Sequence, residues 1–96
     1  MNKLEADYAI RLAGSLWSFE VVTLKLAADC RYTPDFMVIN REDGVVEFHE
    51  VKGHWRDDAK VKLRVAAEKF PMFRFFAAQR DKGCWTITAY GLPDAA

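Results

Sequence analysis

The chain has 96 residues, 51% of them hydrophobic, which is enough for one compact core, so a single domain over residues 1–96 is expected. Two well-separated cysteines indicate neither a disulfide scaffold nor a zinc site, and no apolar run or signal-peptide pattern suggests membrane contact, so we expect a soluble cytoplasmic protein. The formal net charge is zero, but residues 1–51 carry five basic against nine acidic side chains, whereas residues 52–82 carry nine against four. An acidic metal-binding cluster beside a basic phosphate-binding surface would produce this split, and so would ordinary scatter of surface charge.

Residues 2–14 have the pattern of an amphipathic helix. Asn2 is a suitable N-cap, Glu5 completes a capping-box pattern three positions later, and Gly14 is suited to ending the helix. Glu5 nevertheless falls inside the apolar arc of the helix. This glutamate therefore either only caps the helix and complements its dipole, or has a further role.

The rest of the chain alternates between strand-like and helix-like patterns. Strands are predicted by alternation and by flanking turn residues, and a second helix by an apolar stripe with Asp57 or Asp58 as its cap. The predicted strands are residues 17–26, 35–40, 45–52, 73–78 and 84–90, and the predicted second helix is residues 57–69. This αβββαββ order predicts an α/β fold, a mixed β-sheet flanked by helices, in which the second helix provides the crossover between two parallel strands.

The hairpin predicted at residues 35–52 places the charged residues Asp35, Glu50 and Lys52 among apolar residues that are expected to be buried. If its four-residue turn has no bulge, Ile39 lies opposite Val46, and Asp35 lies opposite Glu50. Two facing carboxylates repel one another, and partial burial increases the cost of ionising both. Either a divalent cation with oxygen ligands, such as Mg²⁺, or Lys52 must lie near them, unless a slipped register separates the acids.

These charged residues carry a resemblance to a known family. The segment "YTPDF", the hairpin and "EVKG" resemble the PD-(D/E)xK nuclease motif, in which Asp35, Glu50 and Lys52 match the aspartate, the second acidic residue and the lysine. The segment "KLEADYA" resembles the first-helix glutamate segment of the phage-type endonuclease I and Holliday junction resolvase branch, with Glu5 at the acidic position. The resemblance covers most of the chain and implies a restriction-endonuclease-like core.

The resemblance also implies an activity and a set of ligands. It implies a Mg²⁺-dependent DNA endonuclease, with Mn²⁺ as a substitute, that hydrolyses phosphodiester bonds in branched or four-way DNA as a homodimer, in the host cytoplasm if the protein is phage-encoded. The implied metal ligands are the carboxylates of Glu5, Asp35 and Glu50 and the backbone carbonyl of Val51. Lys52 is implied to orient the attacking water or to stabilise charge in the transition state. Whether Glu5 acts within its own chain or in that of a partner stays open.

Four further residues are candidate DNA contacts. Lys60 and Lys62 lie on the predicted second helix, and His54 and Arg56 lie on the loop that follows the motif. Charges of this kind are also typical of a solvated helix face. By alternation, His49 points away from Glu50 and is expected to be structural.

Two alternatives to the resolvase remain. One is a catalytically inactive nucleic-acid-binding or assembly module on the same fold. The other is a nicking or restriction-type nuclease, although the chain has no recognisable element that would read a DNA sequence.

Overall fold

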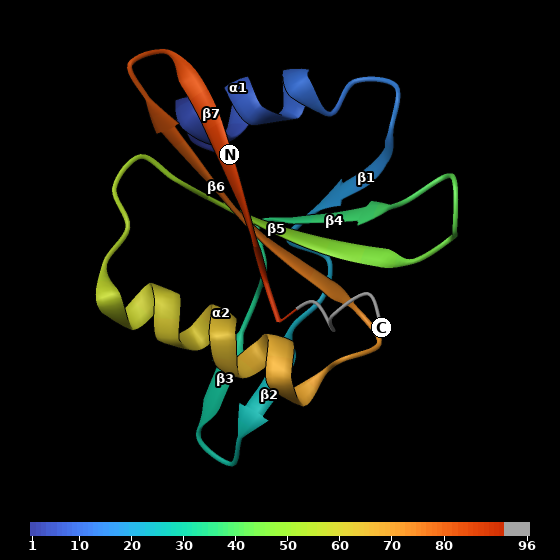
Figure 1. Cartoon of the computed structure of the whole chain (residues 1–96), viewed down its shortest axis with the longest axis vertical. Helices are drawn as coiled ribbons and strands as arrows, with labels where there is room; N and C mark the ends of the chain where they lie inside the picture. Colours follow the sequence, from blue (N-terminus) through green and yellow to red (C-terminus); the bar gives the residue numbers. More distant parts are fainter. Residues whose placement is uncertain (92–96) are drawn as a thin grey trace.

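The computed structural model describes residues 1–91, which form a mixed α/β fold (Figure 1). The described residues contain two helices and seven strands. In chain order these are α1 (Lys3–Arg11), β1 (Leu16–Phe19), β2 (Leu24–Ala27), β3 (Cys30–Tyr32), β4 (Phe36–Ile39), β5 (Val46–Lys52), α2 (Asp57–Lys69), β6 (Arg74–Asp81) and β7 (Cys84–Tyr90).

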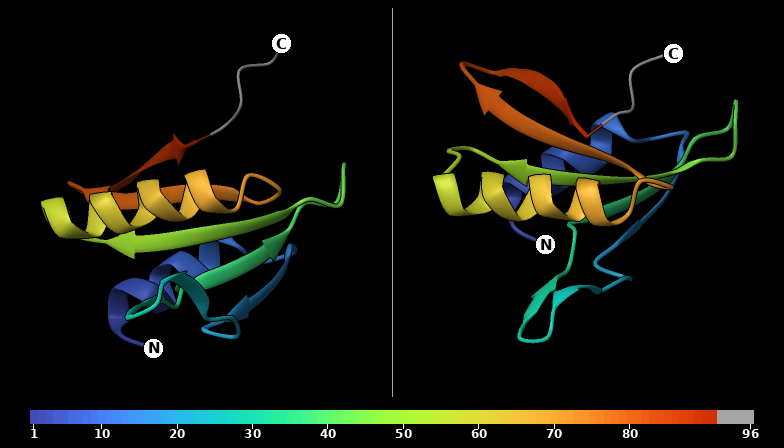
Figure 2. Two further views of the ribbon diagram at one scale, coloured as in Figure 1. Left: turned by 90° about the horizontal axis from the view of Figure 1, so that it is seen from below. Right: turned by 60° about the horizontal axis from the view of Figure 1, so that its bottom comes forward.

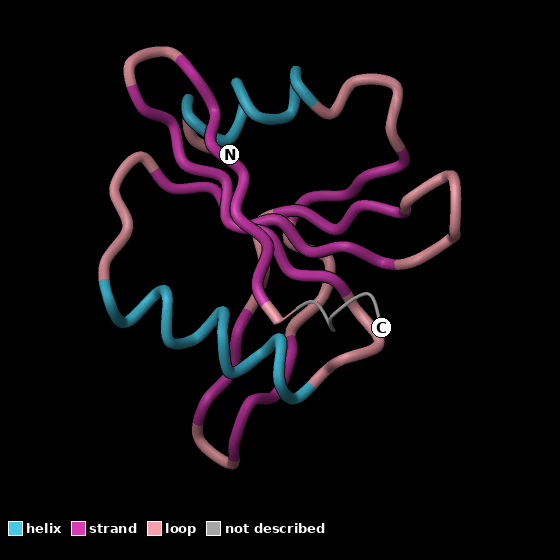
Figure 3. The backbone as a smooth tube through the Cα atoms, viewed as in Figure 1, coloured by secondary structure: helices cyan, strands magenta, loops and turns pink. Residues whose placement is uncertain are grey.

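Five of the strands form one mixed sheet in the order β1-β4-β5-β6-β7 (Figure 3). In the described part of the chain, β5 and β6 pair in parallel, and the other neighbours in this sheet are antiparallel. Helix α2 connects β5 to β6, so the predicted helical crossover between parallel strands is confirmed. Among residues 1–91, strands β2 and β3 pair only with each other, in a separate antiparallel hairpin.

The two helices cover opposite faces of the sheet, as the views in Figure 2 show. Side chains alternate along β5, so Phe48 packs on the α2 face, whereas Val51 packs on the α1 face. The core on the α2 face includes the inner side of the β2–β3 hairpin and contains Leu24, Leu26, Tyr32, Phe48, Trp55, Leu63, Ala66, Ala67, Phe75 and Ala77. The core on the α1 face contains Tyr8, Leu12, Phe36, Val38, Val51 and Ala78.

Helix α1 begins with the capping box that the sequence predicts. The Asn2 side chain accepts a hydrogen bond from the Glu5 N–H at 2.8 Å, and the Asn2 N–H donates to Glu5 Oε1 at 2.7 Å. The helix ends at Arg11, slightly earlier than predicted, and Gly14 then adopts a φ of 88°, a conformation that glycine reaches without steric cost.

The predicted single strand over residues 17–26 is wrong, because the chain breaks at Glu20. This residue has a φ of 49°, which no strand accommodates, and its N–H donates to the Asp35 carbonyl at 2.9 Å. Strand β1 therefore stays in the main sheet, while β2 leaves it and pairs with β3, a strand that was not predicted. The observed order is αβββββαββ and not αβββαββ.

The hairpin of β4 and β5 has the predicted register. Ile39 pairs with Val46 and Met37 with Phe48, and Gly44 adopts a φ of 73° in the turn. This result excludes the slipped register that would have separated Asp35 from Glu50.

The bounds of α2 are confirmed, but its predicted cap is wrong. Arg56 is the N-cap residue, without a side-chain cap hydrogen bond, and Asp57 and Asp58 lie in the first turn. Carboxylates at that position complement the helix dipole, which explains why they occur there without capping. Neither helix of the described chain is long and apolar enough to cross a membrane.

Candidate functional site

Three acidic residues lie side by side where β1, β4 and β5 meet at one end of the sheet. Because Phe19 pairs with Phe36 and Phe36 pairs with His49, the next positions bring Glu20 beside Asp35 and Asp35 beside Glu50. Two hydrogen bonds hold this arrangement, from the Glu20 N–H to the Asp35 carbonyl at 2.9 Å and from the Asp35 N–H to Glu50 Oε1 at 3.3 Å. We call Glu20, Asp35 and Glu50 the acidic row.

Helix α1 adds a fourth carboxylate to one side of the acidic row. Carboxylate oxygens of Glu5, Glu20 and Asp35 lie within 4.8 Å of one another. Glu5 thus caps its helix through Oε1 and also faces Asp35, so the two roles considered for it are compatible. A donor set made only of carboxylate oxygens suits hard divalent cations such as Mg²⁺ and Mn²⁺.

Sequence reasoning missed Glu20 as a member of this cluster. The signal was present, because a regular strand over residues 17–26 would have put Glu20 on one face with the apolar Val22 and Leu24. A carboxylate among apolar neighbours is the same mismatch that drew attention to Asp35 and Glu50.

The surroundings of Asp35 shift its pKa. Its side chain is buried, and Oδ2 accepts a hydrogen bond from the Val51 N–H at 2.8 Å. Burial, followed by the charge of Glu50, raises the pKa of Asp35 to about 7, although the hydrogen bond from Val51 acts in the opposite direction. A proton or a cation beside this carboxylate is therefore favoured near neutral pH.

The backbone of Val51 faces the same cluster. In a strand, the N–H and C=O groups of one residue point to the same side. Since the Val51 N–H points to Asp35, its carbonyl also lies on the side of the acidic row and not on the side of β6. The predicted backbone oxygen ligand therefore fits the geometry.

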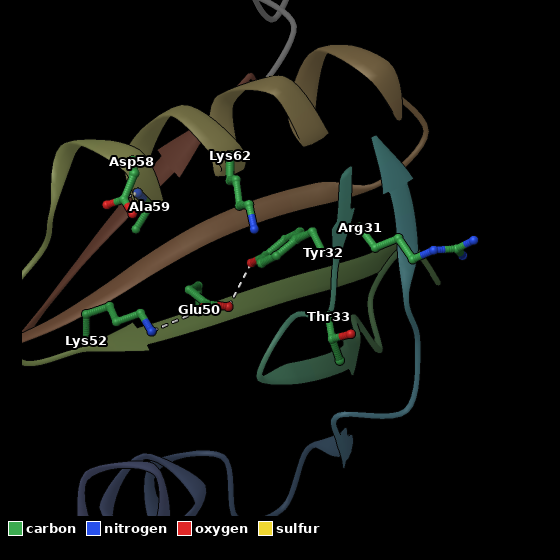
Figure 4. Close-up of a pocket in the computed structure, with 8 residues that line it drawn as sticks. All are labelled: Arg31, Tyr32, Thr33, Glu50, Lys52, Asp58, Ala59 and Lys62. Atoms are coloured by element: carbon green, nitrogen blue, oxygen red, sulfur yellow. Dashed lines mark hydrogen bonds and ion pairs between the residues drawn. The ribbon is translucent and has the colours of Figure 1, made fainter. Parts of the chain in front are cut away.

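Glu50 is held by groups from its own chain. Oε1 accepts a hydrogen bond from the Tyr32 hydroxyl at 2.8 Å, and Oε2 forms an ion pair with Lys52 Nζ at 3.3 Å (Figure 4). Burial, together with the adjacent Glu50 carboxylate, raises the pKa of Tyr32, so its hydroxyl stays a proton donor to Glu50. Lys52 thus neutralises the charge of Glu50, which is one of the two ways considered for relieving the repulsion between the facing carboxylates.

The other three carboxylates have no such partner. Within residues 1–91, no ion pair involves Glu5, Glu20 or Asp35. The uncompensated negative charge is therefore concentrated on the α1 side of the acidic row. Lys52 lies beside this row, and its side chain is 41% exposed.

Two adjoining hollows flank Glu50 and Lys52. The first has a volume of about 320 Å³ and is lined by Arg31, Tyr32, Thr33, Glu50, Lys52, Asp58, Ala59 and Lys62. The second, of about 220 Å³, is lined by Lys52, His54, Arg56, Asp58 and Ala59. In Figure 4, Lys62 extends from α2 toward the side of the hollow where Tyr32 meets Glu50.

The structure separates the four candidate DNA contacts into two groups. His54, Arg56 and Lys62 border the hollows beside the acidic row. Lys60 instead lines a third hollow, with Trp55 and residues of β6 and β7. Contact with DNA stays a prediction for all four, and the geometry favours the first group.

His49 has two partners on the face opposite Glu50. Its Nδ1 lies 2.6 Å from the Tyr8 hydroxyl, and its Nε2 lies 3.0 Å from Glu47 Oε1. Burial lowers the pKa of His49. This placement agrees with the expected structural role, since the ring ties α1 to the sheet.

Comparisons of the chain with protein-family models, with curated proteins and with solved structures found no match. A buried aspartate in a row of acids, a further acid from a helix and an adjacent lysine define a candidate site for a divalent cation and an anionic substrate.

The raised pKa of Asp35 predicts a pH-dependent stability difference between the wild-type protein and Asp35→Asn. Between its ordinary value of 3.8 and about 7, Asp35 holds more protons in the folded than in the unfolded protein, so its contribution to the free energy of unfolding falls as pH rises through this window. Asparagine can still accept from Val51, and its amide can donate to Glu50. Without metal at pH 8, we therefore expect the variant to melt about 5 °C above the wild type, which corresponds to about 1 kcal/mol.

Thermal melts of both proteins at pH 4.5 and pH 8, with and without Mg²⁺, measure this difference. The comparison between variant and wild type cancels the titration of His49, which both proteins share. We expect the difference to shrink at pH 4.5, and Mg²⁺ to raise the melting temperature of the wild type more than that of the variant. A variant less stable than the wild type at pH 8 would contradict the electrostatic account of Asp35.

Proposed function

We propose that this protein is a metal-dependent endodeoxyribonuclease with a restriction-endonuclease-like core that hydrolyses phosphodiester bonds in DNA. The observation that carries the proposal is the acidic row, with Glu5 added from α1 and Lys52 beside it. A folded domain gains nothing in stability from four neighbouring carboxylates of which three lack a basic partner, so a ligand that neutralises them is the simplest reason for their arrangement.

The residues present fit a hard divalent cation. Glu5, Glu20 and Asp35 would hold Mg²⁺ or Mn²⁺ together with the carbonyl of Val51, and Glu50 would complete the set from the other side of Asp35. When bound, such an ion supplies positive charge that stabilises the oxygens of a phosphodiester displacement and lowers the pKa of water.

The neighbouring side chains of the chain have distinct tasks in this proposal. Lys52 reaches solvent from its position against Glu50, so its ammonium group can donate to a phosphate oxygen and stabilise the charge that develops there. Tyr32 and the Asp35 N–H orient the Glu50 carboxylate. The Val51 N–H fixes the rotamer of Asp35.

For the substrate we propose branched DNA, in particular four-way junctions, cut by a homodimer. Support comes from the resemblance of the motif segments and from the basic side chains of Lys62, His54 and Arg56 around the two hollows. A four-way junction has two equivalent strands to cut. Two sites related by a two-fold axis would match this symmetry.

One observation favours a second candidate, a nucleic-acid-binding or assembly module without catalysis. Both oxygens of Glu50 are already engaged by Tyr32, Lys52 and the Asp35 N–H, so this carboxylate is satisfied without a metal. A module of this kind would bind nucleic acid but leave it intact.

A panel of DNA substrates separates the two candidates. We expect the wild-type protein with Mg²⁺ or Mn²⁺ to cut a four-way junction faster than linear duplex, single-stranded or flapped DNA of matched sequence, and to cut none of them in EDTA. Tight binding of the junction without any cutting would support the binding module. Equal cutting of all forms would retain the nuclease but refute selectivity for branched DNA.

A further inference from the structure

The hairpin of β2 and β3 projects from the sheet as a two-stranded arm (Figures 1 and 2). We call residues 24–32 the arm. Its inner face packs on the core of the α2 side through buried Leu24, Leu26 and Tyr32. Its outer side chains alternate with these, and the arm is therefore a braced element whose outer face is free to contact a partner.

A lysine of α2 fixes the position of the arm. Lys69 Nζ donates a hydrogen bond to the Leu26 carbonyl at 3.0 Å, and Tyr32 joins the arm to Glu50 of the main sheet. The arm thus holds a defined distance from the acidic row.

The outer face of the arm places two positive charges directly opposite each other. Lys25 and Arg31 are cross-strand partners, and both are exposed. Like charges at such positions destabilise a hairpin, and neither residue forms an ion pair within the described part of the chain. Their Cβ atoms are expected to lie about 5 Å apart, and the long flexible side chains let the two charged groups contact neighbouring phosphates of one nucleic-acid strand. A bound polyanion would neutralise both positive charges and relieve the repulsion between them.

The arm also leads toward the candidate active site. Arg31 directly precedes Tyr32, whose hydroxyl contacts Glu50, and Arg31 borders the same hollow as Lys62. Figure 4 shows the Arg31 guanidinium extending away from that hollow, on the opposite side from Lys52. Arg31 therefore borders the arm end of this hollow, and Lys52 borders its opposite end beside Glu50 of the acidic row.

We propose that the outer face of the arm binds the phosphate backbone of duplex DNA next to the bond that is cut. The identity of the partner as DNA rests on the proposed function, whereas the phosphate contact rests on Lys25 and Arg31 themselves. Phosphate contacts position a duplex without reading its sequence, so the arm is expected to strengthen binding equally for all sequences.

The test is a binding titration at several salt concentrations, with Ca²⁺ in place of Mg²⁺ to limit cutting. The double variant Lys25→Gln/Arg31→Gln is compared with Arg41→Gln, which removes one positive charge in the turn between β4 and β5, at the other end of β5 from Glu50, and should leave the slope unchanged. Each lost phosphate contact lowers the slope of log affinity against log salt by about 0.9, so we expect a decrease of about 2 and affinity at least about tenfold weaker. The charge-retaining variant Lys25→Arg/Arg31→Lys should bind like the wild type, and melting curves establish that all four proteins fold.

An unchanged salt slope in the folded double variant would overturn the proposal, as would an equal loss in Arg41→Gln. A loss seen with duplex RNA but not with duplex DNA would also overturn it. Cleavage assays with Mg²⁺ are read separately. Suppose that the wild type cuts no DNA, while the salt slope is reduced in the double variant and unchanged in Arg41→Gln. The proposed nuclease activity would then be refuted, and the arm would remain a DNA-binding element.

Discussion

Asp35→Asn is expected to reduce Mg²⁺-dependent cleavage of DNA by on the order of 10³-fold, the loss typical when one preorganised charged or polar group is removed from a transition-state site. Asp35 lies between Glu20 and Glu50 in the sheet, and its carboxylate also lies close to that of Glu5 from α1. Asparagine has nearly the same shape and keeps an oxygen for the Val51 N–H, but it lacks the negative charge that a divalent cation requires. The loss should therefore be chemical and not structural.

Single-turnover cleavage of a labelled four-way junction measures this effect. Glu42→Gln serves as the control, because it removes a carboxylate in the exposed turn between β4 and β5 and should leave the rate unchanged. The same preparations are melted without metal, where Asp35→Asn should be the more stable protein at pH 8. Cleavage by Asp35→Asn at the wild-type rate would remove Asp35 from the active site.

The second large effect is expected for Phe36→Ala, which should lower the free energy of unfolding by about 4 kcal/mol. Phe36 is 0% exposed and lies between the rings of Tyr8, Trp17 and Phe19, at centroid distances of 5.5, 5.4 and 5.3 Å. Its removal leaves a cavity between α1, β1 and β4 that these large rings cannot easily fill. In a domain of this size, the loss corresponds to a fall in melting temperature of about 20 °C.

Urea unfolding followed by fluorescence measures the change. Phe36→Leu, which fills more of the cavity, should lose less stability, and Val61→Ala on the exposed side of α2 should change the free energy of unfolding by less than about 0.5 kcal/mol. A loss below about 1 kcal/mol for Phe36→Ala would show that this aromatic cluster does not hold the domain together. Because Phe36 adjoins Asp35, its alanine variant is also expected to lose cleavage, through misplacement of the carboxylate.

Features with a local cause were predictable from the sequence. The capping box of α1 depends on Asn2 and Glu5, three positions apart, and the bounds of α2 follow from one apolar stripe. The register of the β4–β5 hairpin follows from a four-residue turn, and this register places Asp35 beside Glu50. The central pair of the candidate site was therefore accessible without a structure.

Long-range contacts decided the rest. At Glu20 a φ of 49° ends the strand, while its N–H still pairs with the carbonyl of Asp35, and the alternation of residues 17–26 contains no sign of either. The hydrogen bond keeps Glu20 beside Asp35 in the acidic row, and beyond the turn at Glu20 strand β2 lies outside the main sheet and forms the arm with β3.

The sequence alone thus determined the helices, the central hairpin and the facing pair of Asp35 and Glu50, because neighbours along the chain dictate capping, periodicity and register. Only the tertiary structure decided that Glu20 joins the acids, that Lys60 lies apart from Lys62, and that Lys25 faces Arg31 on a projecting arm. The physical reason is that each of these placements depends on how separate elements pair or pack, which the spacing of residues along one segment does not encode.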